Sequence, residues 1–586
     1  MTDLKKLPIG IESFSEIQSN NYYYVDKTKL IEMLLDHPGK VNLFTRPRRF
    51  GKSLNISMLH SFFEIGTNPT QFDGLYVSKN KSLCDNYLGQ YPVIAISLKG
   101  VDENNFENAY ALLENIIREE ANRFQFLMDS PKLSSIDKTS YERLLSYGME
   151  RSTLSFALRQ LSQLLYKHYG KEVIILIDEY DVPLAKANER GYYDDMVLLM
   201  QNLLGNVLKT NNSLKFAVLT GCLRIAKESI FTGLNNFKVY SITNVDFDEY
   251  FGFTDKEVRK MLQYYRLMEP DGQSDHYDIV KEWYDGYRFG NVDVYCPWDV
   301  INYCRDHLSN SAATPRNYWI NTSGNEIVNR FIDCLDQKDA DKKLTQTELE
   351  LLVSGESVQK KICEELTYKE LYDSVDNIWS TLFMTGYLTS WGQSDSVDGE
   401  CYYELAIPNR EVRNIITNRI LSLFKEHVKK DGEMVDQFCD ALYEGKPELV
   451  EQIFCEYMKK TISVRDTFVR KPLTENFYHG LLLGILSYKS GWMVRSNRET
   501  GNGYCDILIL IDNSNTGIII EVKYSDSNNL EYKCHEALQQ IDDMEYTNFF
   551  EQQGVQNILK YGIACRRKEC CVLLEKTDIN KAGEII

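Results

Sequence analysis

Short apolar segments of strand length alternate with longer helical patterns along the first 330 residues. Four segments are predicted as strands: Val41–Thr45, Tyr91–Leu98, Glu172–Ile177 and Lys215–Leu219. Between them, apolar residues recur at helical spacing over Phe106–Phe126, Tyr141–Tyr147 and Leu154–Tyr169. The strand at Glu172–Ile177 is rich in β-branched residues and almost wholly apolar, which is typical of a strand buried on both faces. The alternation therefore predicts an α/β fold built on a parallel sheet.

The first of these strands, Val41–Thr45, runs into a basic loop that ends in Gly51-Lys52-Ser53, and a helical pattern follows. A strand, such a loop and a helix in this order are typical of a phosphate-binding P-loop. Gly51 lets backbone amides approach phosphate oxygens, Lys52 is placed to neutralise the outer phosphates, and Ser53 to hold Mg²⁺. The usual pattern begins with a glycine five residues before Gly51, and Arg46 stands there instead. The alternative is a plain helix N-terminus with a solvated lysine.

Polar residues end the next two buried strands. Asp178 and Glu179 follow the strand at 172–177, at the end of a parallel sheet where ligands bind. Asp178 is predicted to bind Mg²⁺, directly or through water, and Glu179 to polarise an attacking water. Thr220 ends the following strand and is a candidate sensor of the outer phosphate, with a strand cap as the alternative. Arg224, beyond it, is a candidate for stabilising transferred charge, with an ordinary surface arginine as the alternative. Arg46 and Arg48, in the basic loop, are each candidates for a phosphate contact or a partner contact.

A second group of charged residues lies near the carboxyl end. Two strands, Tyr504–Ile511 and Gly517–Tyr524, are predicted around a polar turn. Asp506 is on the first, and Glu521 and Lys523 leave the same face of the second because they are two residues apart. Such charges on an apolar strand need partners or a metal.

These residue types suit metal-dependent phosphodiester cleavage. Carboxylates hold Mg²⁺ or Mn²⁺, and a lysine orients water or offsets charge in the transition state. Glu475, on a preceding helical pattern, is a candidate third carboxylate, and Arg495–Gly503 is a candidate substrate loop. The alternative is a strand pair in which Lys523 merely forms a salt bridge with Asp506 or Glu521.

Composition bounds these hypotheses. A chain of 586 residues is expected to form two to four domains. The net charge of −19 argues against a broad nucleic-acid coat but allows a local basic groove. The longest apolar runs are too short to span a membrane, and the start of the chain does not have the pattern of a signal peptide. The 14 cysteines are scattered without a CxxC pair, so that a reducing cytoplasm is the predicted location.

The middle of the chain is predicted as a connecting region over residues 331–455. Helices that end in a small hairpin, with strands near Thr389 and Tyr402–Ile407, are compatible with a winged-helix-like module. Because this segment is not basic, packing on the first domain is favoured over DNA binding. The predicted division is thus 1–330, 331–455 and 456–586.

The first domain resembles a family of bacterial AAA-ATPase-like proteins. The motifs that carry the resemblance are YVDKT, RPRRFGKSL, IDEYD, LTGCLRIAKESIFTGLNN, FGFT, WYDGYRFG and VYCPWDV, which span roughly residues 7–325. In that family Arg46 in place of the first glycine is normal. The resemblance implies an ASCE-type P-loop ATPase core with ATP and Mg²⁺ as ligands. For WYDGYRFG, spacing indicates only an aromatic turn around a glycine, and a structural role is favoured.

The carboxyl end, about 455–586, resembles the PD-(D/E)XK nuclease superfamily through Asp506, Glu521-x-Lys523 and a preceding helix with Glu475. The helix around 537–541, with Tyr546, resembles the accessory helix of that superfamily. The resemblance implies a restriction-endonuclease-like α/β domain, which is sometimes inactive in such proteins.

Together these patterns predict a bacterial ATPase coupled to a metal-dependent nuclease, with nucleic acid as partner, DNA favoured over RNA, and no membrane association. Defence against foreign DNA is the hypothesis for its role. The competing class is a nucleotide-switched binding protein whose nuclease-like domain is an inactive docking surface, and a third is a mobile-element or repair ATPase. Whether the chain forms a homo-oligomer is left open.

Overall fold

The structure is a computed structural model of the chain. It describes residues 4–37, 39–224, 237–269, 274–311, 313–319, 328, 331, 346–353, 355–395, 401–417, 419, 432–461, 478–479, 481–483, 485–486, 489, 491–500, 503–512, 514–525, 529–553, 555–566 and 568–578. The chain forms two compact units. Unit 1 contains Met1–Ile327 and Gln359–Val412, and unit 2 contains Val328–Val358 and Arg413–Ile586. The three-part division expected from the sequence stays a prediction.

Unit 1 is built on a parallel five-stranded sheet. Its strands are β1 (Val41–Thr45), β2 (Val93–Ser97), β3 (Val173–Asp178), β4 (Leu214–Gly221) and β5 (Phe237–Tyr240). They lie in the order β2-β3-β4-β1-β5, and each neighbouring pair is parallel. The predicted α/β class with a parallel sheet is confirmed. The edge strand β5 was absent from the sequence prediction.

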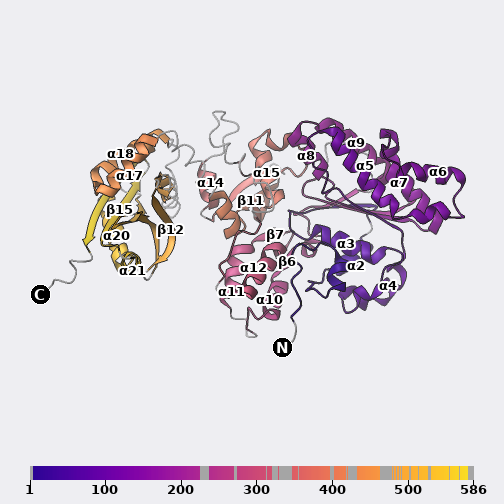
Figure 1. Cartoon of the computed structure of the whole chain (residues 1–586), viewed down its shortest axis with the longest axis horizontal. Helices are drawn as coiled ribbons and strands as arrows, with labels where there is room; N and C mark the ends of the chain where they lie inside the picture. Colours follow the sequence, from indigo (N-terminus) through magenta and orange to yellow (C-terminus); the bar gives the residue numbers. More distant parts are fainter. Residues whose placement is uncertain are drawn as a thin grey trace. The chain divides into compact units, whose positions relative to one another are not determined.

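Helices cover both faces of this sheet. Figure 1 shows α5 (Phe106–Asn122), α7 (Arg151–Tyr169) and α9 (Tyr193–Leu208) on one face and α2 (Lys29–Asp36) and α3 (Lys52–Phe63) on the other. The first three share one buried apolar cluster with β1, β2, β3 and β4. All of β1 and β3 is buried, as the continuous apolar runs predicted. The sheet is thereby fixed from both sides, and the carboxyl ends of its strands are left to form a site.

A smaller sheet and three helices complete the first part of unit 1. Strands β6 (Phe253–Thr254), β8 (Val292–Tyr295) and β7 (Tyr287–Phe289) pair in that order. Helices α10 (Asp255–Tyr264), α11 (Asp275–Tyr284) and α12 (Pro297–Ser309) pack beside them around tyrosine side chains. The second part of unit 1 adds α15 (Val375–Thr385) and the hairpin β10 (Thr389–Asp395) and β11 (Cys401–Ala406).

This hairpin module packs on the rest of unit 1. The backbone amide of Arg288 donates to Thr389 Oγ1 at 3.0 Å, and the rings of Trp319 and Tyr387 lie 4.8 Å apart. Gly386 ends α15 with φ +88°, and a Cβ there would lie 2.9 Å from Pro47 in the basic loop. The module therefore reaches the loop that the sequence marks as a phosphate site.

Unit 2 contains a five-stranded sheet in the order β12-β13-β14-β15-β16. The bounds are β12 (Trp492–Thr500), β13 (Gly503–Ile511), β14 (Thr516–Tyr524), β15 (Asn557–Arg566) and β16 (Glu569–Asp578). Only β14 and β15 pair in parallel. The loop predicted over Arg495–Gly503 was wrong, because residues 495–500 belong to strand β12, which pairs with β13. A substrate contact at these residues stays a prediction. Its mixed apolar and charged residues do not show the run of apolar side chains from which β13 and β14 were recognised.

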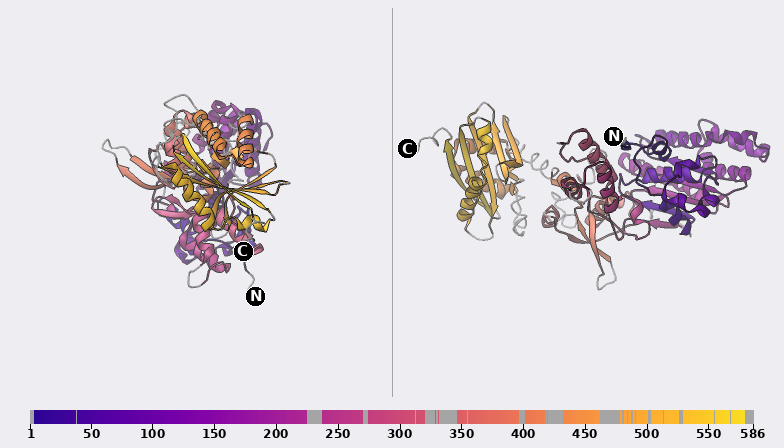
Figure 2. Two further views of the ribbon diagram at one scale, coloured as in Figure 1. Left: turned by 90° about the vertical axis from the view of Figure 1, so that its left-hand side faces the viewer. Right: turned by 90° about the horizontal axis from the view of Figure 1, so that it is seen from below.

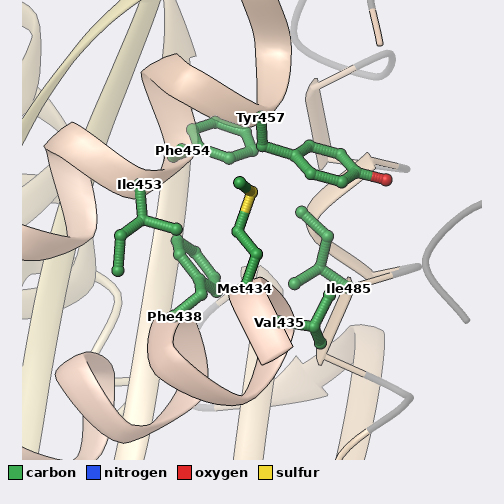
Figure 3. Close-up of a pocket in the computed structure, with 7 residues that line it drawn as sticks. All are labelled: Met434, Val435, Phe438, Ile453, Phe454, Tyr457 and Ile485. Atoms are coloured by element: carbon green, nitrogen blue, oxygen red, sulfur yellow. The ribbon is translucent and has the colours of Figure 1, made fainter. Parts of the chain in front are cut away.

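The two faces of this sheet are covered by different helices. Figures 1 and 2 show α17 (Gly432–Glu444) and α18 (Pro447–Thr461) on one face and α20 (Leu530–Asp543) on the other. Even-numbered residues of β14 enter the cluster with α17 and α18, and Ile519 enters the cluster with α20. A small pocket lies between α17 and α18, and Figure 3 shows the side chains that line it. Among the described residues no helix is both long and apolar enough to cross a membrane.

A glycine between α11 and β7 supplies a test of the hairpin packing. Gly286 has φ +90°, and a Cβ at this position would lie 1.9 Å from the carbonyl oxygen of Pro408. Gly74 has a similar φ of +79° but open space around its Cβ position. We expect Gly286→Ala to destabilise unit 1 by about 2–5 kcal/mol, whereas Gly74→Ala costs about 1 kcal/mol.

The measurement is denaturant unfolding followed by tryptophan fluorescence, because five of the six tryptophans lie in unit 1. Equal losses of stability in the two variants would contradict the close contact with Pro408.

Candidate functional sites

The basic loop between β1 and α3 has the backbone of a phosphate-binding turn. Gly51 adopts a left-handed φ of +79° and caps α3, which begins at Lys52. The ammonium group of Lys52 is buried under the loop and donates to the carbonyl oxygens of Arg46 at 3.0 Å and Pro47 at 2.9 Å. The N-terminus of a helix then faces the loop, as anion binding requires.

Arg46 is the residue that stands where a glycine usually begins the loop. Its side chain is completely buried and donates to the carbonyl oxygens of Thr45 at 2.8 Å and Tyr240 at 2.7 Å. The guanidinium also lies over the Phe251 ring at 5.0 Å. Burial lowers the pKa of Arg46 to about 9. Arg46 is thus turned inward and braces the loop, whereas the sequence left a phosphate or partner contact open for it.

Three of the predicted residues meet at the ends of β3 and β4 and the start of α3. The Asp178 carboxylate accepts from Ser53 Oγ at 2.6 Å and from Thr220 Oγ1 at 2.5 Å. They come together because β4 lies between β1 and β3, so that the strand ends form one edge. A hydroxyl and a carboxylate side by side are oxygen ligands of the kind Mg²⁺ prefers.

Glu179 lies next to this group in an uncommon backbone conformation. Its φ is +50°, and its amide donates to Thr220 Oγ1 at 3.4 Å. Burial raises the pKa of the Glu179 carboxyl, and the nearby Lys52 ammonium opposes that shift. A left-handed non-glycine residue at a strand end is a feature that clusters at functional sites.

The structure gives the two predicted arginines different neighbours. Arg224 forms an ion pair with Glu365 at 2.7 Å. Arg48 has an exposed side chain, and charge interaction with the Cys222 thiol, more than with the Tyr368 hydroxyl, raises the pKa of its guanidinium. The roles of both arginines in phosphate binding stay predictions.

A segment of the second part of unit 1, residues 363–369, lies along this edge of the site; we refer to it as the strap. Tyr368 Oη donates to the Asp181 carboxylate at 3.4 Å, and Thr243 Oγ1 donates to Glu364 at 2.6 Å. Asp181 is buried and also accepts from the backbone amides of Cys222 at 2.8 Å and Leu223 at 3.0 Å. Burial raises the pKa of Asp181.

Sequence reasoning missed Asp181 and the strap. The second aspartate of the IDEYD motif was the available signal for Asp181. The strap has no motif of its own, and its Tyr368 lies 187 residues further along the chain than Asp181.

In unit 2, Asp506, Glu521 and Lys523 share the face of the sheet that carries α20. The backbone amide of Val522 donates to Asp506 Oδ2 at 2.9 Å, and the amide of Asp506 to Glu521 Oε2 at 3.4 Å. Lys523 Nζ donates to Glu521 Oε1 at 3.1 Å. The three predicted side chains are therefore brought together at one place. The fourth, Glu475, lies outside the described residues.

Glu521 is the most deeply placed of these charges, with 1% of its surface exposed. Burial raises its pKa to about 7, with the Asp506 carboxylate adding to the shift and Lys523 opposing it. His479, on the preceding helical segment, places Nε2 2.9 Å from the carbonyl oxygen of Asp506. A buried carboxyl whose neighbours displace its pKa toward neutrality is a feature of functional sites.

The donor set fits a hard divalent cation in part. Asp506 and Glu521 offer carboxylate oxygens on one face, and a bound cation would offset the repulsion between them. Among the described residues, no group of three or more His, Cys, Asp or Glu side chains is arranged to hold a metal. A third ligand would therefore come from water, from substrate or from a residue outside the described ones, such as Glu475.

Comparison with known proteins identifies both segments. Residues 8–231 match the family described as predicted AAA-ATPase, AAA-ATPase-like, and residues 473–575 match the PD-(D/E)XK nuclease superfamily. The chain carries an AAA-ATPase-like domain and a PD-(D/E)XK superfamily domain. It is also 25% identical over 557 residues, 94% of each chain, to an uncharacterised protein in the vnfD 5′ region of Azotobacter chroococcum mcd 1. No solved structure matches the chain.

Residues that follow the matched segment also pack against the basic loop of the AAA-ATPase-like domain. Phe50 of the basic loop packs against Tyr287 and Phe289 of the WYDGYRFG motif, with ring centroids 4.9 and 5.1 Å apart. Phe289 also faces the Arg46 guanidinium at 5.2 Å. The WYDGYRFG motif therefore packs against the basic loop.

Stability of the PD-(D/E)XK superfamily domain should depend on pH through Glu521. Its pKa of about 7 in the folded chain exceeds the ordinary value of 4.5, so that the folded state binds more protons between these values. Ionisation therefore destabilises the fold as pH rises from about 4.5 to 7. In EDTA, the free energy of unfolding of Glu521→Gln relative to wild type should increase by up to about 3 kcal/mol from pH 5 to pH 8.

Urea unfolding at each pH measures this difference, with hydrogen exchange of peptides from β14 as the readout. Glu536→Gln, on α20, is the matched control and should show no such gain. A pH-independent difference between wild type and Glu521→Gln would argue against the neutral buried carboxyl.

Proposed function

We propose that this chain binds and hydrolyses ATP and couples that cycle to a metal-dependent nuclease. The observation that carries the proposal is the Asp506, Glu521 and Lys523 cluster, which lies on one sheet face inside the segment that matches the nuclease superfamily. The Ser53, Asp178 and Thr220 group supports the ATP half. DNA is the favoured substrate over RNA.

The ATP site would use the residues around the basic loop. Lys52 would bind the outer phosphates through its ammonium group, and Ser53 and Asp178 would hold Mg²⁺. Glu179 would accept a proton from the attacking water, a role that suits a carboxylate of raised pKa. Thr220 bonds to both Asp178 and the backbone of Glu179, a link through which it would report the state of the phosphates. Arg224 would reach the site only if its ion pair with Glu365 opened.

The nuclease site would use Asp506 and Glu521 to hold Mg²⁺ or Mn²⁺, which would polarise the phosphate and lower the pKa of a bound water. Lys523 would orient the water or offset charge on the phosphate. In the absence of divalent cations the Lys523 ammonium neutralises Glu521, so that metal binding and this ion pair compete.

We expect Lys52→Ala to abolish ATP binding, because it removes the cation of the phosphate loop. Binding of a fluorescent ATP analogue measures the effect, with a loss of at least about 100-fold. Lys215→Ala, at the opposite end of β4 from Thr220, is the control and should bind normally. Circular dichroism verifies the fold, and unchanged ATP affinity in Lys52→Ala would refute the assignment.

We expect Mg²⁺- or Mn²⁺-dependent cleavage of nucleic acid by the full chain with ATP, reduced at least about 100-fold in Glu521→Ala and in Lys523→Ala. Glu536→Ala should cleave like wild type. A panel of single- and double-stranded DNA and RNA gives the substrate. If the wild type cuts none of them, and both variants keep normal ATP turnover, the nucleotide-switched binding protein becomes the better description.

The proposed biological role is defence against foreign DNA, and only the pairing of an ATPase-like with a nuclease-like domain motivates it. Cells that carry the gene should survive a phage panel at least about tenfold better than cells with the Glu521→Ala gene. Equal survival across the panel would remove this role, and stimulation of ATP turnover by host DNA would then favour a repair or mobile-element ATPase.

A further inference from the structure

The adjacent cysteines of β16, Cys570 and Cys571, place one thiol on each face of the unit 2 sheet. Each face is covered by a helix that brings a cysteine of its own. Cys455 comes from α18 and Cys534 from α20. The ATPase-like and nuclease-like sites use none of these four residues.

The two faces differ in how close the sulfurs lie. On the α18 face, Cys455 Sγ and Cys570 Sγ are 3.4 Å apart. On the α20 face, the described contact is from Cys534 Sγ to the carbonyl oxygen of Cys571 at 3.1 Å. Sulfurs at 3.4 Å need to approach by little more than 1 Å to reach the bond length of a disulfide, about 2.05 Å. The α18 face therefore holds two thiols whose sulfurs are already close to bonding distance.

The two thiols of this pair have different surroundings. Cys455 is partly exposed, and its sulfur accepts the backbone amide of Cys570 at 3.3 Å. Cys570 is buried, and its hydrogen bond to Cys455 together with burial raises the pKa of its thiol well above the ordinary range. The more accessible sulfur is the better candidate to meet an oxidant. Cys570, whose sulfur lies 3.4 Å away, is within reach to resolve the oxidised Cys455.

We propose that Cys455 and Cys570 are a modification site at which peroxide forms a reversible disulfide between α18 and β16. The Cys455 thiolate attacks one peroxide oxygen, so that an S–O bond forms, the O–O bond breaks and hydroxide leaves. Cys570 then attacks the sulfur of the resulting sulfenic acid, the S–S bond forms, and the oxygen leaves as water with the Cys570 proton. The two thiols lose two electrons and two protons, and the peroxide is reduced to two waters.

The disulfide would tie a helix to the strand at the far edge of the sheet. The bridged residues are 115 positions apart in the sequence, and β12, β13, β14 and β15 all fall within that stretch of chain. Such a cross-link restricts the unfolded chain and raises the stability of the unit that it closes. In a cytoplasm kept reducing by thiols, a bond of this kind is transient and follows oxidative conditions.

The test uses the reduced full chain with stoichiometric hydrogen peroxide in EDTA, followed by alkylation and tryptic mapping without reduction. The expected product links peptide 431–459 to peptide 569–576. Each peptide carries a second cysteine, Cys439 and Cys571, so variants are needed to assign the link. It should disappear in Cys455→Ser and Cys570→Ser and persist in Cys439→Ser and Cys571→Ser.

Two measurements on the wild type keep the test independent of how the variants fold. Fragmentation of the linked peptides between residues 570 and 571 assigns the bridging sulfur directly. The midpoint temperature for thermal unfolding of unit 2 should rise by several degrees on oxidation and return to its original value on addition of dithiothreitol. A link through Cys571, or oxidation of Cys455 to sulfinic acid without any link, would overturn the proposal.

Discussion

The Asp178 carboxylate is the interaction on which the proposed ATP site depends. It stands at the end of a wholly buried strand, and it accepts hydroxyls from Ser53 on α3 and Thr220 on β4. A carboxylate at this depth is costly unless its oxygens are paired. The two hydroxyls supply that pairing and fix the start of α3 against the neighbouring strand ends. The proposed cation and phosphate site would use the same geometry that stabilises this charge.

The loop beside Asp178 is kept in place by a second buried charge. Arg46 donates to carbonyl oxygens of the loop and β5, and Phe251 and Phe289 cover its guanidinium. A glycine there would bring flexibility, whereas the arginine brings a rigid brace. Because WYDGYRFG supplies Phe289 and also contacts Phe50, the brace extends beyond the segment that matches the ATPase-like family. The phosphate loop is therefore a product of residues spread over more than 240 positions.

The sequence predicted the strands in which apolar residues follow one another with few interruptions, because such a run is typical of a strand inside a sheet. It predicted β1 to the residue, and β3, β4, β13 and β14 closely. It did not predict β5, β12, β15 and β16, and it took part of β12 for a loop. Strand β12 carries charged residues and is held by pairing with β13, which is a long-range interaction that a local pattern does not record.

The candidate sites show the same division. Asp178, at the end of β3, and Glu521, within β14, could be found because a charged residue that interrupts or ends an apolar run is visible in the sequence alone. The inward turn of Arg46 and the contact of the strap with Asp181 depend on tertiary packing. Motif spacing alone therefore identified the chemical groups but not the residues that hold them.

The two proposed sites stabilise their buried carboxylates in different ways, and this difference bears on how they would respond to a metal. Asp178 is paired by neutral hydroxyls, so a cation could join the group without displacing a charge. Glu521 is paired by Lys523 and repelled by Asp506, and its raised pKa reflects that balance. A divalent cation at Glu521 would have to displace a proton or the lysine ammonium, each of which opposes binding. The nuclease site would thus bind metal more weakly at low pH than the ATP site does, so its occupancy would be the more sensitive to conditions around the chain.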